Sequence, residues 1–163
     1  MRKIFALAAV VFLSVAGIAH AEPAGPFTWS SAYLRETPAK IGAAYVQLQN
    51  PTQSDDALIG ASASWAGRIE LHQIKSGPNG VMQMMPIDKI AFPKGGALVL
   101  QQGGYHLMIF DIKDKLNVDE KKEITLKFEK AGPIVIPFVV QPISGSPEGF
   151  RQKLMMDHSH HGM

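Results

Sequence analysis

The stretch 122–129, with the sequence KEITLKFE, is the clearest indication of the fold in this chain. Ile124, Leu126 and Phe128 alternate there with charged residues or threonine. In an extended strand every second side chain points to the same face, so this pattern is typical of a strand with one buried and one solvated side. We therefore predict a β-strand here that covers a hydrophobic core.

Short runs of similar β-like character occupy most of the chain between its two ends. They lie at 43–49, 57–63, 68–74, 81–87, 97–101, 106–112 and 134–140. Turn-forming sequences separate them, among them 50–51 (NP), 77–80 (GPNG) and 103–104 (GG). The spacing predicts an all-β sandwich or barrel. Pro137 in the last run predicts an edge strand or a bulge, because proline has no N–H to give to a sheet.

The two ends of the chain differ from this middle part. Arg2 and Lys3 give the start of the chain, 1–3, a positive charge, and 4–15 are almost entirely apolar. Ala19-His20-Ala21 then has the small-x-small pattern that a signal peptidase recognises. Together these features predict a cleaved signal peptide at 1–21. We therefore expect export to the periplasm and a folded domain at 22–145. The Met- and His-rich stretch 146–163 is predicted to be a flexible tail.

The charge balance and the absence of cysteine exclude several classes of function. The chain has 16 Lys and Arg residues and 14 Asp and Glu residues, and removal of 1–21 takes away Arg2 and Lys3 but no acidic residue. The rest of the chain is therefore balanced, which argues against a nucleic-acid-binding surface. Without cysteine, blue-copper and other thiolate sites are excluded. A soft-metal site would have to use methionine and histidine.

Histidine and methionine recur at strand spacing in three of the predicted strands. His106 and Met108 are two residues apart, so that on a strand both point to one face, and Met82 and Met84 form a second such pair. His72 lies in a third strand. Thioether sulfur favours Cu(I), and imidazole also suits copper. Since methionine in a strand is often core filler, the pattern alone leaves a metal site and a metal-free interaction module open.

Three segments carry a resemblance to a known family. The segments 70–72 (ELH), 81–88 (VMQMMPID) and 103–108 (GGYHLM) together resemble the motif of the periplasmic copper chaperones called PCu(A)C. That motif is His, ten residues, Met, twenty-one residues, and His-x-Met. The resemblance extends over nearly the whole chain after residue 21.

The intervals of the motif match this chain with one departure. Twenty-one residues separate Met84 from His106, and Met108 completes the His-x-Met end. Eleven residues, one more than in the family, separate His72 from Met84. The turn at 77–80 could absorb the extra residue without moving the strands.

The resemblance implies a cupredoxin-like, immunoglobulin-like antiparallel β-sandwich that binds Cu(I). Its ligands would be His72, Met84, His106 and Met108, with Met82 or Met85 as alternatives to Met84. It also implies a chaperone that delivers copper for assembly of the copper centre of cytochrome c oxidase, and we expect a monomer that is not an enzyme. The acceptor would be an oxidase subunit or another copper chaperone. Because ligand exchange needs an exposed ligand, we expect the His106-x-Met108 pair to be accessible.

The tail offers residues for a second site, and further functions compete with the first. Its candidate ligands are Met155, Met156, His158, His160, His161 and Met163, which would suit Cu(I) through sulfur or Cu(II) through imidazole. A copper-buffering or resistance role is an alternative to delivery. Cleavage after Ala19 would instead leave His20 as an N-terminal copper ligand, as in copper-brace enzymes, and N-terminal sequencing would detect that.

Overall fold

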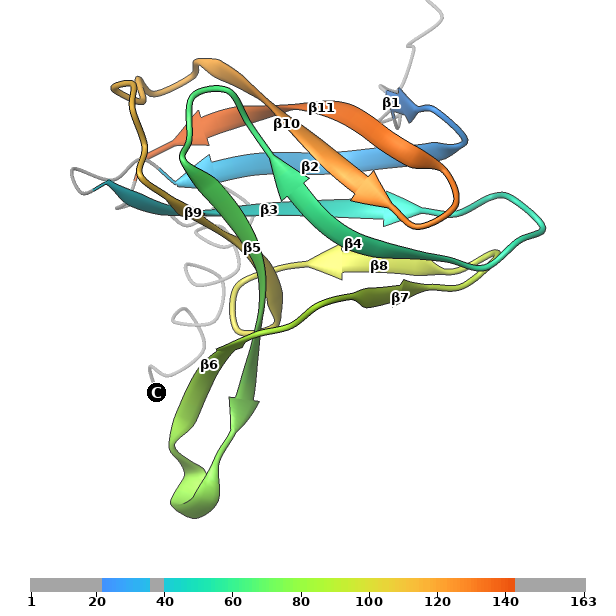
Figure 1. Cartoon of the computed structure of the whole chain (residues 1–163), viewed down its shortest axis with the longest axis horizontal. Coiled ribbons are helices and arrows are strands. Elements are labelled where there is room, and N and C mark those ends of the chain that lie inside the picture. Colours follow the sequence, from blue (N-terminus) through green and yellow to red (C-terminus); the bar gives the residue numbers. More distant parts are fainter. Residues whose placement is uncertain (1–21, 36–39, 143–163) are drawn as a thin grey trace, which may run out of the picture.

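The computed structural model describes residues 22–35 and 40–142 (Figure 1). Within these ranges the chain forms strands and one short 3-10 turn, Pro78–Gly80. The strands are β1 (Glu22–Ala24), β2 (Phe27–Arg35), β3 (Ile41–Gln49), β4 (Asp56–Ser62), β5 (Arg68–Ser76), β6 (Met82–Pro86), β7 (Ile90–Phe92), β8 (Ala97–Leu100), β9 (Tyr105–Phe110), β10 (Lys121–Phe128) and β11 (Gly132–Gln141). The all-β prediction is confirmed. The predicted signal peptide, 1–21, and tail, 146–163, lie outside the described residues.

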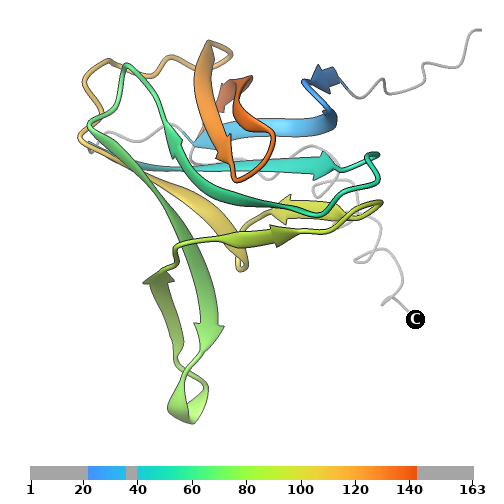
Figure 2. The same ribbon diagram turned by 45° about the vertical axis from the view of Figure 1, so that its right-hand side comes forward.

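The strands form a closed sandwich. Following the hydrogen-bonded neighbours, β5 is joined to β9, β3, β2, β11, β10 and β4, and a pairing of Ala61 with Ile69 brings β4 back to β5. Most pairings are antiparallel as predicted, but β11 with β2 and β8 with β9 are parallel. The β5–β6 hairpin extends away from the sandwich in both ribbon views (Figures 1 and 2), and β6 lies at the end of the strand order.

Alternating apolar residues from these strands fill one core. The predicted inward face of β10 is confirmed, since Ile124, Leu126 and Phe128 are all buried. Phe27 packs edge-on against Phe92 and Phe128, with ring centroids 4.8 Å apart in both pairs. Because burial of apolar area is the dominant favourable term in folding, this core provides the scaffold on which the surface strands are held.

The longest stretch that the sequence pattern did not identify as a strand is β2. Its register against β3 shifts between Ser30 and Tyr33, and Ser31 has a φ of 53°. Phe27 is buried before this bulge and Ala32 after it, so the inward face changes parity along the strand. A β-bulge inserts one unpaired residue and thereby breaks the period-two alternation that identifies strands in a sequence.

Pro137 lies where β11 has a free edge. β11 pairs with β10 along 132–139, but it pairs with β2 only over 139–141. The prediction of an edge strand or a bulge is wrong, because β11 lies between β10 and β2 and pairs with β10 without a shift of register. Proline is nevertheless tolerated at 137, since this residue lies outside the β2 ladder. Among the described residues, no helix is long and apolar enough to cross a membrane.

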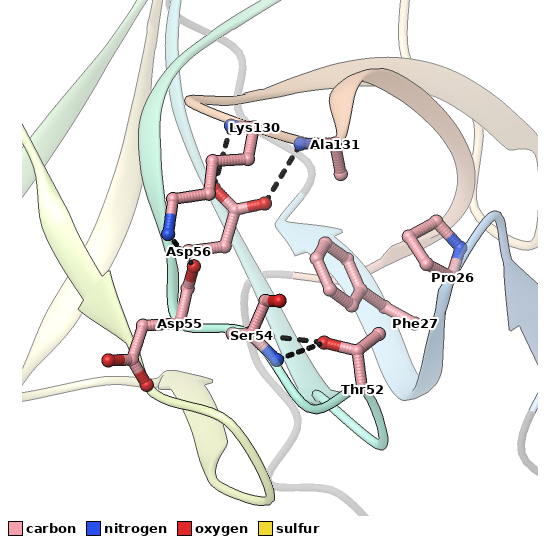
Figure 3. A pocket seen from close by; sticks show the side chains of 8 residues that line it. All are labelled: Pro26, Phe27, Thr52, Ser54, Asp55, Asp56, Lys130 and Ala131. Atoms are coloured by element: carbon pink, nitrogen blue, oxygen red, sulfur yellow. Dashed lines mark hydrogen bonds between the residues drawn. The ribbon is translucent and has the colours of Figure 1, made fainter.

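Asp56, at the start of β4, fastens the β10–β11 turn to the sandwich (Figure 3). Its carboxylate accepts hydrogen bonds from the backbone N–H groups of Lys130 and Ala131, both at 2.9 Å, and of Ala57 at 2.7 Å. Burial acts to raise the pKa of Asp56, but these three hydrogen bonds outweigh it and hold the pKa below its usual value. The side chain is therefore an ionised clamp on this turn.

Asp56→Ala is expected to lower the free energy of unfolding by about 1–3 kcal/mol at neutral pH, because the turn loses the acceptor for its N–H groups. A group with a depressed folded-state pKa stabilises above its unfolded pKa, about 3.9 for aspartate, and loses that contribution as the pH falls through the folded-state pKa. Urea unfolding of both proteins should therefore converge in strong acid. Asp88→Asn, at an exposed aspartate, is the control, and equal loss in both variants would contradict the clamp.

Candidate metal centre

His72 and His106 lie opposite one another on neighbouring strands. They are register partners in the antiparallel β5–β9 pair, and their ring centroids are 5.8 Å apart. Side chains directly opposite in such a pair share one face of the sheet, and here the adjacent Leu71 and Leu107 point into the core. The two histidines therefore belong to the outer face, yet only 8% of His72 and 2% of His106 is exposed.

Each ring uses one nitrogen in a hydrogen bond within the protein. Nδ1 of His106 lies 3.1 Å from the carbonyl oxygen of Gly104, and Nε2 of His72 lies 2.9 Å from Oε2 of Glu70. The other two nitrogens, Nδ1 of His72 and Nε2 of His106, are buried without a hydrogen-bond partner. A buried polar atom without a partner costs about 1–3 kcal/mol, so a pair on facing residues is typical of a ligand site.

The electrostatics keep the His106 imidazole neutral. Burial lowers the pKa of His106 and the neighbouring His72 lowers it further, while the hydrogen bond to the Gly104 carbonyl acts in the opposite direction. A neutral imidazole with Nδ1 donating to a carbonyl has its lone pair on Nε2. The unpartnered nitrogen of His106 is therefore able to coordinate a cation at neutral pH.

Met108 lies on the same face as this histidine pair. It follows His106 by two residues on β9, and its cross-strand partners are Glu70 on β5 and Ala43 on β3. Its side chain is partly buried. The structure thus places three of the four predicted ligands on one patch of two adjacent strands.

Met84 reaches the same face from the protruding hairpin. It pairs with Ile74, which is two residues from His72, and so lies on the face of His72; Met85 pairs with Gln73 and lies on the opposite face. Met82 shares the face of Met84 but is one step further from the histidines. The geometry therefore favours Met84 among the three methionines left open by the sequence.

The two strands of the β5–β6 hairpin pair in an unbroken register up to the turn. The register runs without a shift from His72 opposite Pro86 to Ser76 opposite Met82. The turn is closed by a 2.7 Å hydrogen bond from Gly77 N to Val81 O, and Gly80 has a φ of 76°, which favours glycine. The paired strands between His72 and Met84 therefore contain no bulge.

One expectation about accessibility was wrong. His106 is almost fully buried, with the rings of His72 and Tyr45 beside its own ring. Met84 is instead 52% exposed, since β6 is the last strand of the order and has a free edge. The exposed residue of the predicted set is therefore on the hairpin and not in the His-x-Met pair.

Several neighbours of the histidines were not identified from the sequence. Tyr45 on β3 lies with its ring centroid 6.4 Å from that of His106, and Phe110 lies 6.3 Å from His72. Burial raises the pKa of Tyr45, so its phenol stays neutral. Glu70 could have been found from its spacing, since it precedes His72 by two residues, whereas Tyr45 is brought close only by the β3–β9 pairing.

Hydrogen bonds from His72 and from Arg68 lower the pKa of Glu70, which is therefore ionised at neutral pH. In the described part of the chain, no three His, Cys, Asp and Glu side chains gather closely enough to bind a metal by themselves. A metal at the histidine pair would consequently draw on the thioethers. His20 and the predicted tail ligands, 155–163, lie outside the described residues.

Several solved structures have a fold similar to that of this chain. The chain is similar to the apo PCuAC domain from PmoF1, with 23% identity and a TM-score of 0.64, over 76% of this chain and 99% of that one. The copper-bound PCuAC domain from PmoF2 gives 24% identity and a TM-score of 0.63, over 76% and 98% of the two chains. Copper(I)-bound DR1885 from Deinococcus radiodurans gives 29% identity and a TM-score of 0.53, over 76% and 81%. These likenesses establish the cupredoxin-like fold of PCuAC domains.

The sequence is also similar to a known protein and to a protein family. A protein of Leifsonia xyli subsp. xyli, named "Putative lipoprotein Lxx21020", is 27% identical over 125 residues, which cover 75% of this chain and 74% of that protein. The family described as "Putative lipoprotein LpqE-like" matches residues 28–140, which include nearly all of the described strands and both histidines. The chain therefore belongs to the LpqE-like family.

Proposed function

We propose that this protein is a copper chaperone that binds Cu(I) through His72, Met84, His106 and Met108 and transfers it to an acceptor protein. The observation that carries the proposal is the pair of buried, unpartnered imidazole nitrogens on directly opposed residues. Thioether sulfur from Met84 and Met108 on the same face completes a set of soft, neutral donors. Such a set favours Cu(I) over the harder divalent metals.

The named relatives support copper as the cargo. One similar structure is a copper-bound PCuAC domain and another is a Cu(I)-bound protein. The lipoprotein descriptions of the family and of the Leifsonia protein support a location in the cell envelope, in agreement with the signal peptide predicted at 1–21. We infer that the protein acts in the periplasm, as a monomer, by binding and transfer and not by catalysis.

Transfer would proceed by ligand exchange at the exposed side of the site. Met84 is the most accessible of the four ligands and lies on the protruding hairpin, so an acceptor could approach there first. Anionic thiolates are stronger donors to Cu(I) than neutral thioethers, which would favour the acceptor. Assembly of the copper centre of cytochrome c oxidase is the proposed destination, and copper buffering is the alternative.

Met84→Leu is expected to weaken Cu(I) binding by about tenfold or more, which corresponds to about 1.4 kcal/mol, because a soft donor is replaced by a side chain of similar size that cannot coordinate. Anaerobic competition titration of the full secreted chain measures the affinity, and X-ray absorption reports the number of sulfur neighbours. Met85→Leu is the matched control, since Met85 is adjacent but on the opposite face.

The outcomes separate the candidate ligand sets. Loss of one sulfur neighbour in Met84→Leu and none in Met85→Leu supports the proposed site. Equal affinity in the wild type and both variants, or a loss confined to Met85→Leu, would contradict the assignment of Met84. Absence of Cu(I) binding to the wild type would contradict the proposed function as a whole.

The predicted tail ligands, Met155, Met156, His158, His160, His161 and Met163, are proposed to hold a second copper ion. A chain truncated after Gly149 should retain one tightly bound Cu(I) and lose any additional Cu(I) or Cu(II). Copper stoichiometry measured by elemental analysis after dialysis tests this expectation. If all binding disappears with the tail, the sandwich does not contain the site, and the histidine pair has another role.

A further inference from the structure

We infer that Glu70 is a positioning residue that orients His72 with Nδ1 toward the metal and places a negative charge behind it. This inference rests on the proposed Cu(I) site and deepens it. It also assigns different coordinating atoms to the two histidines, Nδ1 for His72 and Nε2 for His106. Nothing in the His and Met spacing of the sequence distinguishes these atoms.

The first observation is that both oxygens of Glu70 are engaged. Oε2 lies 2.9 Å from Nε2 of His72, and Oε1 lies 2.8 Å from Nε of Arg68. Glu70 and His72 are two residues apart on β5 and therefore on the same face. The carboxylate thus bridges a buried imidazole to a surface cation in a fixed geometry.

The second observation is that Arg68 is itself held in place. Its guanidinium lies 4.1 Å from the centre of the Phe110 ring, and Phe110 is the register partner of Arg68 across β5 and β9. Nη1 of Arg68 also lies 3.6 Å from Oδ2 of Asp111. A guanidinium that stacks on an aromatic face and pairs with carboxylates loses much of its freedom, so it restrains Glu70 in turn.

The proton on His72 follows from these contacts. A carboxylate paired with a guanidinium has no proton to donate and only accepts, so Nε2 of His72 must be the donor. A histidine that binds a metal is in its neutral form, in which the imidazole carries one proton, and with that proton on Nε2 the lone pair is on Nδ1. That atom is the buried, unpartnered nitrogen of His72, and it belongs to the residue that faces His106.

The charge of Glu70 also bears on the bound ion. Two imidazoles and two thioethers are neutral, so the proposed ligand set leaves the charge of Cu(I) uncompensated. The cluster of Glu70, Arg68 and Asp111 has a net charge of −1 when all three are ionised. A carboxylate hydrogen-bonded to a metal-ligating histidine is a common arrangement that orients the ring and makes it a better donor.

The test begins with the metal-free full chain, so that it does not depend on copper. Two-bond proton–nitrogen correlation spectra distinguish protonated from bare ring nitrogens. We expect His72 to carry its proton on Nε2 and His106 on Nδ1, with a hydrogen-bonded Nε2–H signal for His72 that is lost in Glu70→Val. A His72 protonated on Nδ1, or a signal unchanged in the variant, would overturn the inference.

The second arm measures Cu(I) affinity by anaerobic competition. Glu70→Val is expected to bind about 10–100-fold more weakly, the usual effect of losing such a partner of a metal-ligating histidine. Glu70→Gln retains an acceptor oxygen and should lose less. Glu129→Gln, at an exposed carboxylate directly after β10, is the control for charge alone and should bind as the wild type does.

The two arms distinguish the failure of this inference from that of the proposed function. If the wild type binds Cu(I) and Glu70→Val binds it equally well, Glu70 does not position His72, and the copper site stands. If the wild type binds no Cu(I), the proposed function fails, whatever the ring protonation. Thermal melts establish that Glu70→Val is folded, and the wild-type spectrum tests the tautomers without any variant.

Discussion

The antiparallel register of β5 and β9 is the constraint on which the candidate site depends. It sets His72 opposite His106 and Glu70 opposite Met108, so that one patch of sheet carries two imidazoles, a thioether and a carboxylate. A shift of one residue would turn one strand's functional side chains toward the core, since side chains alternate with a period of two. Leu71 and Leu107, buried between these residues, hold the register by their burial.

The closed sandwich makes that register rigid, while the hairpin that carries Met84 is only partly tied to it. β5 and β9 belong to the ring of paired strands over the common core, whereas β6 pairs with β5 alone and presents exposed methionines at its outer side. The proposed ligands therefore divide into a buried histidine pair in a fixed geometry and a thioether at the accessible edge. This division suits an ion that must be held and then released.

Hydrogen bonds and burial on this patch hold each histidine ring in one orientation. Burial favours the neutral form of His106, and the Gly104 carbonyl determines which of its nitrogens carries the proton. On the other strand, Arg68, stacked on Phe110, holds the Glu70 carboxylate against His72. Each histidine is thus oriented by a different acceptor, a backbone carbonyl in one case and a carboxylate in the other.

The resemblance to the PCu(A)C motif indicated the four candidate ligands. The sequence by itself determined most of the strand pattern and the absence of thiolate chemistry, because alternation and composition are local properties. It did not reveal β2, where the bulge at Ser31 interrupts the alternation, nor that His106 is buried. Only the tertiary structure placed Met84, and not Met85, on the face of His72, and brought Tyr45 beside His106. These depend on which strands become neighbours and in what register, and that is settled by packing between segments far apart in the chain.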